Sequence, residues 1–234
     1  MGGPIEGRQF VSYPKSGRTW IRYALNLLGV ADQIRFHHDT FEFNNPAKPA
    51  PNLDFEERLQ RYQSVEKIVY LYRDPRDVMV SLYFQVTGRF KDFFGYEGTI
   101  SDFIRDEYFG AMHLRAFQTQ WAEMCKRRPV LQISYEACHQ DFASVLRAVL
   151  AHYELPIDDG AVADACGRAS FDEMRALEQR AAFPKPWLRP RNDALKVRRG
   201  VVGGFRDYLS DEDIAYLGDV FGLGTGVRAD ASCG

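Results

Sequence analysis

The sequence lacks several features that mark disulfide-rich, metal-binding, membrane or nucleic-acid-binding proteins. Its four cysteines, Cys125, Cys138, Cys166 and Cys233, are far apart and form no CxxC pair, so we expect reduced thiols in a cytoplasmic setting and neither a disulfide framework nor a metal site. An apolar run of about 18 residues is absent, and the first residues do not resemble a secretory signal, so no membrane span or export is expected. A formal net charge of −2 gives no overall attraction to nucleic acid or acidic membranes.

The composition is that of an ordinary globular chain, with 45% hydrophobic and 26% charged residues. A length of 234 residues suits one well-cored domain and is short for two. We find no internal repeat or linker, so we expect a single domain over residues 1–234, with flexible ends at about 1–7 and 224–234.

The stretch Phe10 to Trp20, FVSYPKSGRTW, predicts a strand, a tight turn and a helix. Pro14 ends the strand because it has no N–H to donate, and Gly17 allows the backbone to approach a ligand. The free N–H groups at the helix start favour an anion. The alternative is a plain turn with a solvated Lys15, because the GxxxxGK[ST] phosphate loop is absent.

Two further buried strands follow the same pattern. Lys67 to Tyr72 runs into the basic turn Arg73 to Asp77 and a helix over Val78 to Phe84, and Val130 to Ser134 leads to Tyr135. Strand-turn-helix units of this kind predict an α/β fold, with a central parallel β-sheet flanked by helices and its carboxyl strand ends facing one ligand.

Less distinctive segments complete the prediction. A short strand is expected at Ile34 to Asp39 and an aromatic, irregular segment at Gly88 to Gly110 with a helix from Ile100. Asp77 is interpreted as a helix cap, as is Asp141. The remaining expected elements are a loop over Thr40 to Asn52 and helices at about Asp54 to Tyr62, after Asp141, at Ala161 to Cys166, at Phe171 to Gln179 and after Ser210.

Three basic segments therefore converge: Lys15 in the first turn, Arg73 and Arg76 in the second, and Arg198 and Arg199 near the C-terminus. One phosphate group would not need this number of cations, whereas a ligand with phosphate groups at two ends would. The strings YPKSGxTW, RDPRDVxVSxY and RRGxxGxF, in this order, resemble the sulfotransferase family that uses 3′-phosphoadenosine-5′-phosphosulfate, PAPS. The resemblance covers nearly the whole chain and implies the P-loop-nucleotide-kinase-like sulfotransferase fold.

The resemblance also implies roles for individual residues. The segment Lys15, Ser16, Gly17, Arg18 and Thr19 would hold the 5′-phosphosulfate, and Trp20 would pack on adenine. Arg73 and Ser81 would hold the 3′-phosphate, with Arg198, Arg199 and Gly200 closing over it. Tyr135, Ala169, Ser170 and Phe171 fall where the family surrounds the purine. Two departures from the family's animal cytosolic members are Arg18 in place of a small hydroxyl residue and Gly204-Phe205 in place of Asp-Trp.

The chemistry of sulfuryl transfer suits these residue types. Negative charge grows on the bridging oxygen of the leaving phosphate, and Lys15 is the cation expected to stabilise it. His38 is the favoured general base, because Asp39 beside it would orient the ring, and His37 is the next candidate. Neighbouring side chains on a strand point to opposite faces, so only one of the two histidines can point into the cleft. Both could instead be packing or surface histidines. Ser81 completes the catalytic candidates.

The expected activity is in-line transfer of a sulfuryl group from PAPS to a hydroxyl of a small, partly apolar acceptor, with PAP released and no metal required. A secondary metabolite is one candidate, and the acceptor walls are expected at Phe84 to Tyr96 and Asn44 to Asn52. The alternatives are a nucleotide or small-molecule kinase, for which Asp74 and Asp77 come closest to metal-holding carboxylates, and an inactive PAP-binding module. The helices resemble those of a bacterial member, and the oligomeric state stays open.

Overall fold

The computed structural model describes residues 7–39, 43, 54–180, 191–192 and 199–223. Several features expected from the sequence lie outside these ranges: both expected end segments apart from Gly7, the loop at residues 44–52, Arg198 and Cys233.

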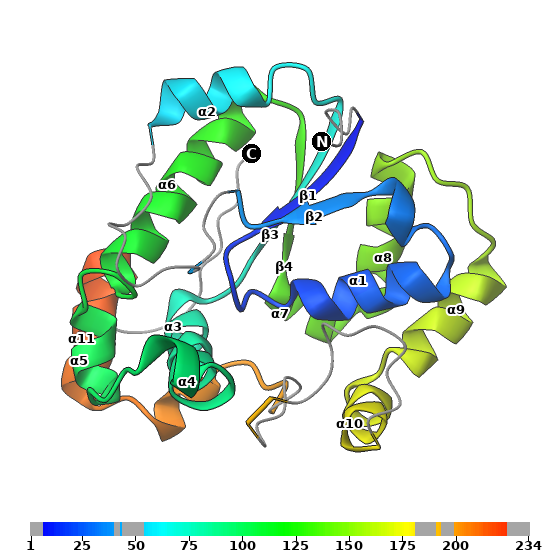
Figure 1. The fold of residues 1–234 in the computed structure, drawn as a ribbon. Coiled ribbons are helices and arrows are strands. Elements are labelled where there is room, and N and C mark those ends of the chain that lie inside the picture. The colour runs from blue at the N-terminus through cyan, green and yellow to red at the C-terminus, as the bar shows by residue number, and fades with distance from the viewer. Residues whose placement is uncertain (1–6, 40–42, 44–53, 181–190, 193–198, 224–234) are drawn as a thin grey trace.

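A four-stranded parallel sheet forms the centre of the molecule (Figure 1). Its strands are β1 (Arg8–Ser12), β2 (Arg35–His37), β3 (Lys67–Tyr72) and β4 (Val130–Ser134), in the spatial order β2-β1-β3-β4. Every neighbouring pair is parallel. The predicted α/β class with a central parallel sheet is confirmed, and β2 stops at His37, two residues before the predicted end.

Helices cover both faces of this sheet (Figure 1). They are α1 (Arg18–Leu27), α2 (Phe55–Arg61), α3 (Pro75–Phe84), α4 (Lys91–Phe94), α5 (Ile100–Arg105), α6 (Ala111–Arg127), α7 (Tyr135–Gln140), α8 (Phe142–His152), α9 (Asp159–Arg168), α10 (Phe171–Gln179) and α11 (Asp211–Phe221). Short 3-10 turns occupy Ala31–Gln33 and Gly204–Asp207. In the described ranges, no helix is long and apolar enough to cross a bilayer.

Alternating side chains of the central strands divide the core between the two faces. On β3, Ile68 and Tyr70 pack into the cluster beneath α3, α5, α6 and α11, whereas Val69 and Leu71 pack into the cluster beneath α1, α8 and α9. All four are buried. A strand buried on both faces has this continuous apolar sequence, because successive side chains point to opposite sides.

Three stretches differ from the prediction. Asp74 caps α3 by accepting the Arg76 N–H at 2.9 Å, so α3 begins at Pro75 and Asp77 is not its cap. The segment expected to be irregular from Gly88 is helical at first: a π-helical turn, Gln85–Arg89, continues α3, and α4 follows. The 17-residue α6 was not predicted, although its buried Leu114, Phe117, Trp121 and Met124 recur at helical spacing. Asp141 caps α8 as predicted, by accepting the Ser144 N–H at 2.9 Å.

Candidate functional site

A cavity of about 220 Å³ lies at the carboxyl edge of the sheet, where β1, β3 and β4 pass into their helices. It is lined by Pro14, Lys15, Gly17, Arg18, Thr19, Trp20, His38, Arg73, Asp77, Val80, Ser81, Gln85, Tyr135, His139, Phe171, Met174, Arg199, Gly200, Val201 and Gly204. The cavity therefore brings together residues from all three basic segments of the sequence.

The turn after β1 forms one wall of the cavity. Lys15 and Gly17 both have positive φ, 72° and 100°, a region that glycine adopts easily and lysine rarely. Gly17 is the N-cap of α1, and among the described residues no side chain supplies a capping hydrogen bond. A Cβ on Gly17 would lie 2.4 Å from the Tyr135 ring, so the close approach of turn and ring requires glycine here. Ser16 is buried outside the cavity lining.

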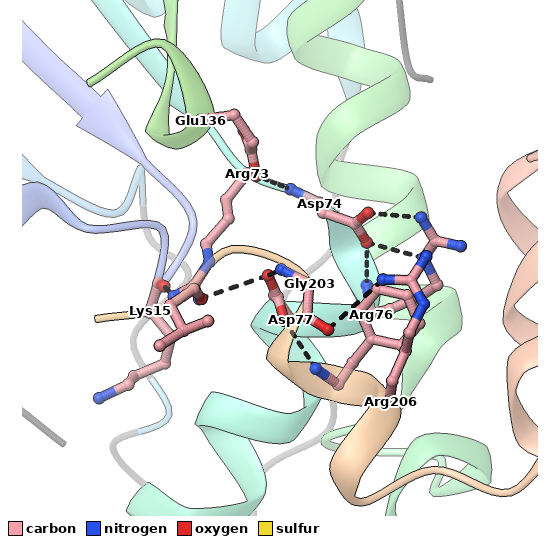
Figure 2. A network of polar contacts seen from close by, with 10 residues as sticks. Lys15, Arg73, Asp74, Arg76, Asp77, Glu136, Gly203 and Arg206 are labelled. Carbon is pink, nitrogen blue, oxygen red and sulfur yellow. Dashed lines mark hydrogen bonds and ion pairs between the residues drawn. The ribbon is translucent and has the colours of Figure 1, made fainter. Parts of the chain in front are cut away.

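Arg73, the first residue after β3, connects this turn to the C-terminal segment. Its guanidinium donates to the carbonyl oxygens of Lys15 at 3.3 Å and Val201 at 3.2 Å. It also lies over the Tyr135 ring, 4.1 Å from the centroid. The side chain of Lys15 extends away from Arg73 (Figure 2), so the two cations occupy different parts of the site.

Asp77 holds the C-terminal segment against α3 (Figure 2). Its carboxylate accepts the backbone N–H of Gly203 at 2.8 Å and that of Phe205 at 3.0 Å, and it lies 3.6 Å from Nη2 of Arg73. The side chain is 3% exposed. Asp77 is therefore the anchor of a loop that lines the cavity, a role that the sequence did not indicate.

Arg76 does not line the cavity, contrary to the convergence expected from the sequence. Its guanidinium pairs with the carboxylate of Asp74 at 2.6 Å and lies 4.3 Å from the centre of the Phe205 ring. The backbone N–H of Asp74 in turn donates to Glu136 at 3.0 Å (Figure 2). Both acidic candidates for a metal thus have structural partners, and within the described ranges no group of three metal-ligating side chains is found.

Part of the cavity lining is aromatic. Trp20 stacks on Phe142 at 4.4 Å and meets the edges of Tyr135 and His139 at 6.0 and 5.0 Å. His139 lies in α7 and lines the cavity, although the sequence analysis treated it as structural. Burial, followed by the charge of Arg73, lowers the pKa of His139.

Phe171, at the start of α10, meets the C-terminal segment at Gly200. A Cβ on Gly200 would lie 2.2 Å from the Phe171 ring, and Gly200 has a φ of 62°. Arg199 pairs with Asp207 at 2.6 Å and still lines the cavity. The neighbouring candidates Ala169 and Ser170 do not line it: Ala169 is a core residue, and Ser170 caps α10.

The two adjacent histidines face different surroundings. His38 lines the cavity, with Nε2 2.7 Å from Nη2 of Arg18 and Nδ1 2.7 Å from the Ser12 carbonyl oxygen. His37 instead contacts Gln9 at 2.9 Å through Nε2 and accepts the Asp39 backbone N–H at 3.0 Å. Burial, aided by the charges of Arg35, Arg18 and Arg61, lowers the pKa of His37 to about 3, so this ring is neutral at pH 7.

Asp39 does not orient His38 in the way that the sequence suggested. Its carboxylate is buried and pairs with Arg58, and it also accepts from Tyr62 at 2.9 Å and Trp121 at 3.2 Å. The Ser12 carbonyl, at the end of β1, contacts Nδ1 of His38 and orients the ring in place of this carboxylate.

Of the two predicted acceptor walls, Asn44 to Asn52 lies outside the described residues, and Phe84 to Tyr96 contributes little to the cavity. From residues 84–96 only Gln85 lines it, while Phe94 and Tyr96 pack on Phe109 at 5.2 and 5.8 Å. Val80, Met174 and Val201 also line the cavity and were not predicted, because apolar side chains carry no chemical signature in the sequence.

The charge of the described lining is strongly positive. Lys15, Arg18, Arg73 and Arg199 are cationic, and Asp77 is the acidic member of the set. Cations around an aromatic wall, at the carboxyl ends of parallel strands, define an α/β protein with a site for an anionic, ring-bearing ligand such as a nucleotide.

Comparisons with known proteins identify the family. The sequence model of the sulfotransferase domain matches residues 10–226, so the chain belongs to the sulfotransferase family. Rat sulfotransferase 2B1 is 26% identical over an alignment of 226 residues, and this alignment covers 86% of this chain and 65% of the rat protein. The chain thus spans slightly less than two thirds of that relative.

Solved structures agree on the fold. The crystal structure of mouse sulfotransferase SULT7A1 complexed with PAP superposes with a TM-score of 0.66 at 20% identity, covering 94% of this chain and 85% of the mouse chain. Retinol dehydratase in complex with androsterone and inactive cofactor PAP gives 0.62 at 17% identity, covering 99% and 85%.

Proposed function

We propose that the protein transfers a sulfuryl group from PAPS to a hydroxyl of a small acceptor and releases PAP. The observation that carries this proposal is a cavity shared by the Lys15 turn, Arg73 directly after β3 and the Arg199 segment, beside an aromatic wall. PAPS carries phosphate groups at the 3′ and 5′ positions of its ribose and a purine on the same sugar, which matches this combination of charges and rings.

The lining suggests how the donor would be held. Lys15, Gly17, Arg18 and Thr19, at the start of α1, would bind the 5′-phosphosulfate. The 3′-phosphate would lie between Arg73, Ser81 and the segment of Arg199 and Gly200, with Arg198 as a further candidate outside the described ranges. Trp20, Tyr135 and Phe171 would enclose the purine; Phe142 already covers one face of Trp20, so the indole can offer the purine its other face or its edge.

The proposed chemistry assigns two side chains to the reacting atoms. Lys15 would stabilise the charge that develops on the leaving phosphate oxygen, and this interaction strengthens in the transition state. Nε2 of His38 would take the proton of the attacking hydroxyl; His37 is a weaker candidate, because its ring is held by Gln9 and the Asp39 backbone.

The acceptor is proposed to be small and partly apolar, a class to which the androsterone held by retinol dehydratase belongs. Val80, Gln85 and Met174 are the lining residues available to contact it. The widely spaced cysteines support a cytoplasmic setting, which we also propose together with a bacterial origin.

A transfer assay tests the proposed function. The protein is incubated with PAPS labelled in the sulfuryl group and a panel of phenols, sterols and other alcohols, and labelled product and PAP are separated by chromatography. We expect label in at least one alcohol, lost in His38→Asn and retained in part by His37→Asn. Phosphoryl transfer from ATP and magnesium without sulfuryl transfer would instead indicate a kinase, and PAP binding without any transfer would indicate an inactive module.

A further inference from the structure

The hydrogen bonds of His38 determine where its proton lies. A guanidinium group only donates hydrogen bonds, and a carbonyl oxygen only accepts them. Arg18 therefore donates to Nε2 of His38, and Nδ1 donates to the Ser12 carbonyl, both at 2.7 Å. The ring is neutral, with its proton on Nδ1 and its lone pair on Nε2.

From this geometry we infer that Arg18 is a positioning residue for His38: it fixes the neutral Nδ1–H tautomer and covers the basic nitrogen until an anion in the cavity draws the guanidinium away. The inference rests on the proposed function, since it concerns the same base. This chain has Arg18 at the position where the animal cytosolic members of the family have a small hydroxyl residue.

The charges around His38 favour the neutral ring. Arg18 contacts it directly, and Lys15, Arg73 and Arg199 line the same cavity, with Asp77 as the acidic group among them and His139 as a further titratable one. On the strand side, Asp39 is paired with Arg58, and His37 is uncharged at pH 7. A proton on Nε2 would place a second cation beside the guanidinium, which like-charge repulsion opposes.

The arrangement requires an exchange during the reaction. Nε2 has one lone pair, so it can accept either from Arg18 or from the acceptor hydroxyl. Arg18 lines the cavity at the helix start proposed for the phosphosulfate, where a bound anion would attract it. When the guanidinium leaves Nε2, the hydroxyl O–H can donate there; its proton passes to Nε2 as its oxygen bonds to sulfur and the phosphate oxygen departs. The base would thus become available only after the donor has bound.

Nitrogen NMR of histidine-labelled protein tests this inference without an acceptor. In the free wild type, we expect His38 as the Nδ1–H tautomer. In Arg18→Ser, its protonation midpoint should move to higher pH by roughly one unit or more, because a neighbouring cation has been removed. Arg18→Lys, which keeps the charge, should retain part of the effect and serves as the second variant if Arg18→Ser fails to fold. His139 lines the same cavity against Trp20 and Tyr135 and provides the internal reference.

The second step of the test adds PAP. We expect PAP to shift the Nε2 resonance of His38 in the wild type and to leave it nearly unchanged in Arg18→Ser. An unchanged midpoint in a folded Arg18→Ser, or the same response to PAP in both proteins, would overturn the inference. If the midpoint shifts and yet PAP does not bind, the positioning role stands and the proposed function fails, so the two are distinguishable.

The pH profile of turnover gives an independent check. Loss of Arg18 should move the acid limb to higher pH, since more of His38 is protonated at a given pH. A purely structural role would lower turnover at every pH by the same factor.

Discussion

Replacing Asp77 by asparagine should weaken the attachment of the C-terminal segment to the cavity. The carboxylate offers one oxygen to the N–H of Gly203 and the other to that of Phe205. An amide group has one accepting oxygen, so in Asp77→Asn one backbone N–H would face an NH2 group instead. Arg73 would also lose its anionic neighbour at 3.6 Å.

The expected cost follows from the burial of these groups. Asp77 is 3% exposed, and a buried donor left without an acceptor costs about 1–3 kcal/mol. Loss of the charge beside Arg73 acts in the same direction. We expect the unfolding free energy to fall by at least this amount, and hydrogen exchange at the amides of Gly203 and Phe205 to accelerate by roughly tenfold or more.

Urea unfolding and amide exchange by NMR measure the two effects. Asp211→Asn is the matched control, because it removes an exposed carboxylate from the first turn of α11 and should change stability by less than about 0.5 kcal/mol. Equal stability of the two variants, with unchanged exchange at Gly203 and Phe205, would refute the anchoring role of Asp77.

Three further predictions concern single residues. Lys15→Met should lower turnover by about 10²–10³-fold with a much smaller loss of PAP affinity, and equal losses in both would contradict a role chiefly in the transition state. The pKa of His37 is about 3 in the folded protein and 6.5 in the unfolded chain, so on acidification the unfolded chain binds a proton at this residue before the folded protein does. The folded state therefore loses stability as the pH falls below 6.5. Between pH 7 and 5 this loss is about 2 kcal/mol, which urea unfolding should find missing in His37→Gln. Gly200→Ala, whose Cβ meets the Phe171 ring, should weaken PAP binding in titrations at least about tenfold, whereas Gly222→Ala, at the similar φ of 66° and with nothing within 4 Å, should leave binding unchanged.

The parallel sheet and the succession of strands and turns along the chain could be predicted because the signals are local. Lys67–Tyr72 is apolar and bounded by charge, and Pro14 and Gly17 mark the turn after β1. A strand that is covered by helices on both faces needs apolar side chains along its whole length. The apolar strand sequences therefore sufficed to predict a parallel sheet between layers of helices.

The roles of the acidic residues could not be predicted from neighbouring residues, since their partners are distant in sequence. Asp77 binds backbone groups about 126 residues away, and Asp39 pairs with Arg58 and Trp121. Helix caps are local and could be predicted for Asp141, whereas Asp77 was wrongly taken as the cap of α3 although Asp74 precedes Pro75, a pairing typical of a helix start.

His139 illustrates a signal that was present and not used. Tyr135 and His139 are four residues apart in α7, so their side chains share one face of the helix. Since Tyr135 was already a purine candidate, this spacing would have placed His139 beside it. The sequence alone could not show that α7 begins directly after β4 and turns this face to the cavity.

The most direct test of the account is a calorimetric titration of the protein with PAP and, separately, with ADP, each with and without magnesium. We expect PAP to bind more tightly than ADP, with an affinity that magnesium does not change, because Arg73, Ser81 and Arg199 would hold the 3′-phosphate that ADP lacks. Equal or tighter binding of ADP, strengthened by magnesium, would contradict the account and leave these cations without the ligand assigned to them.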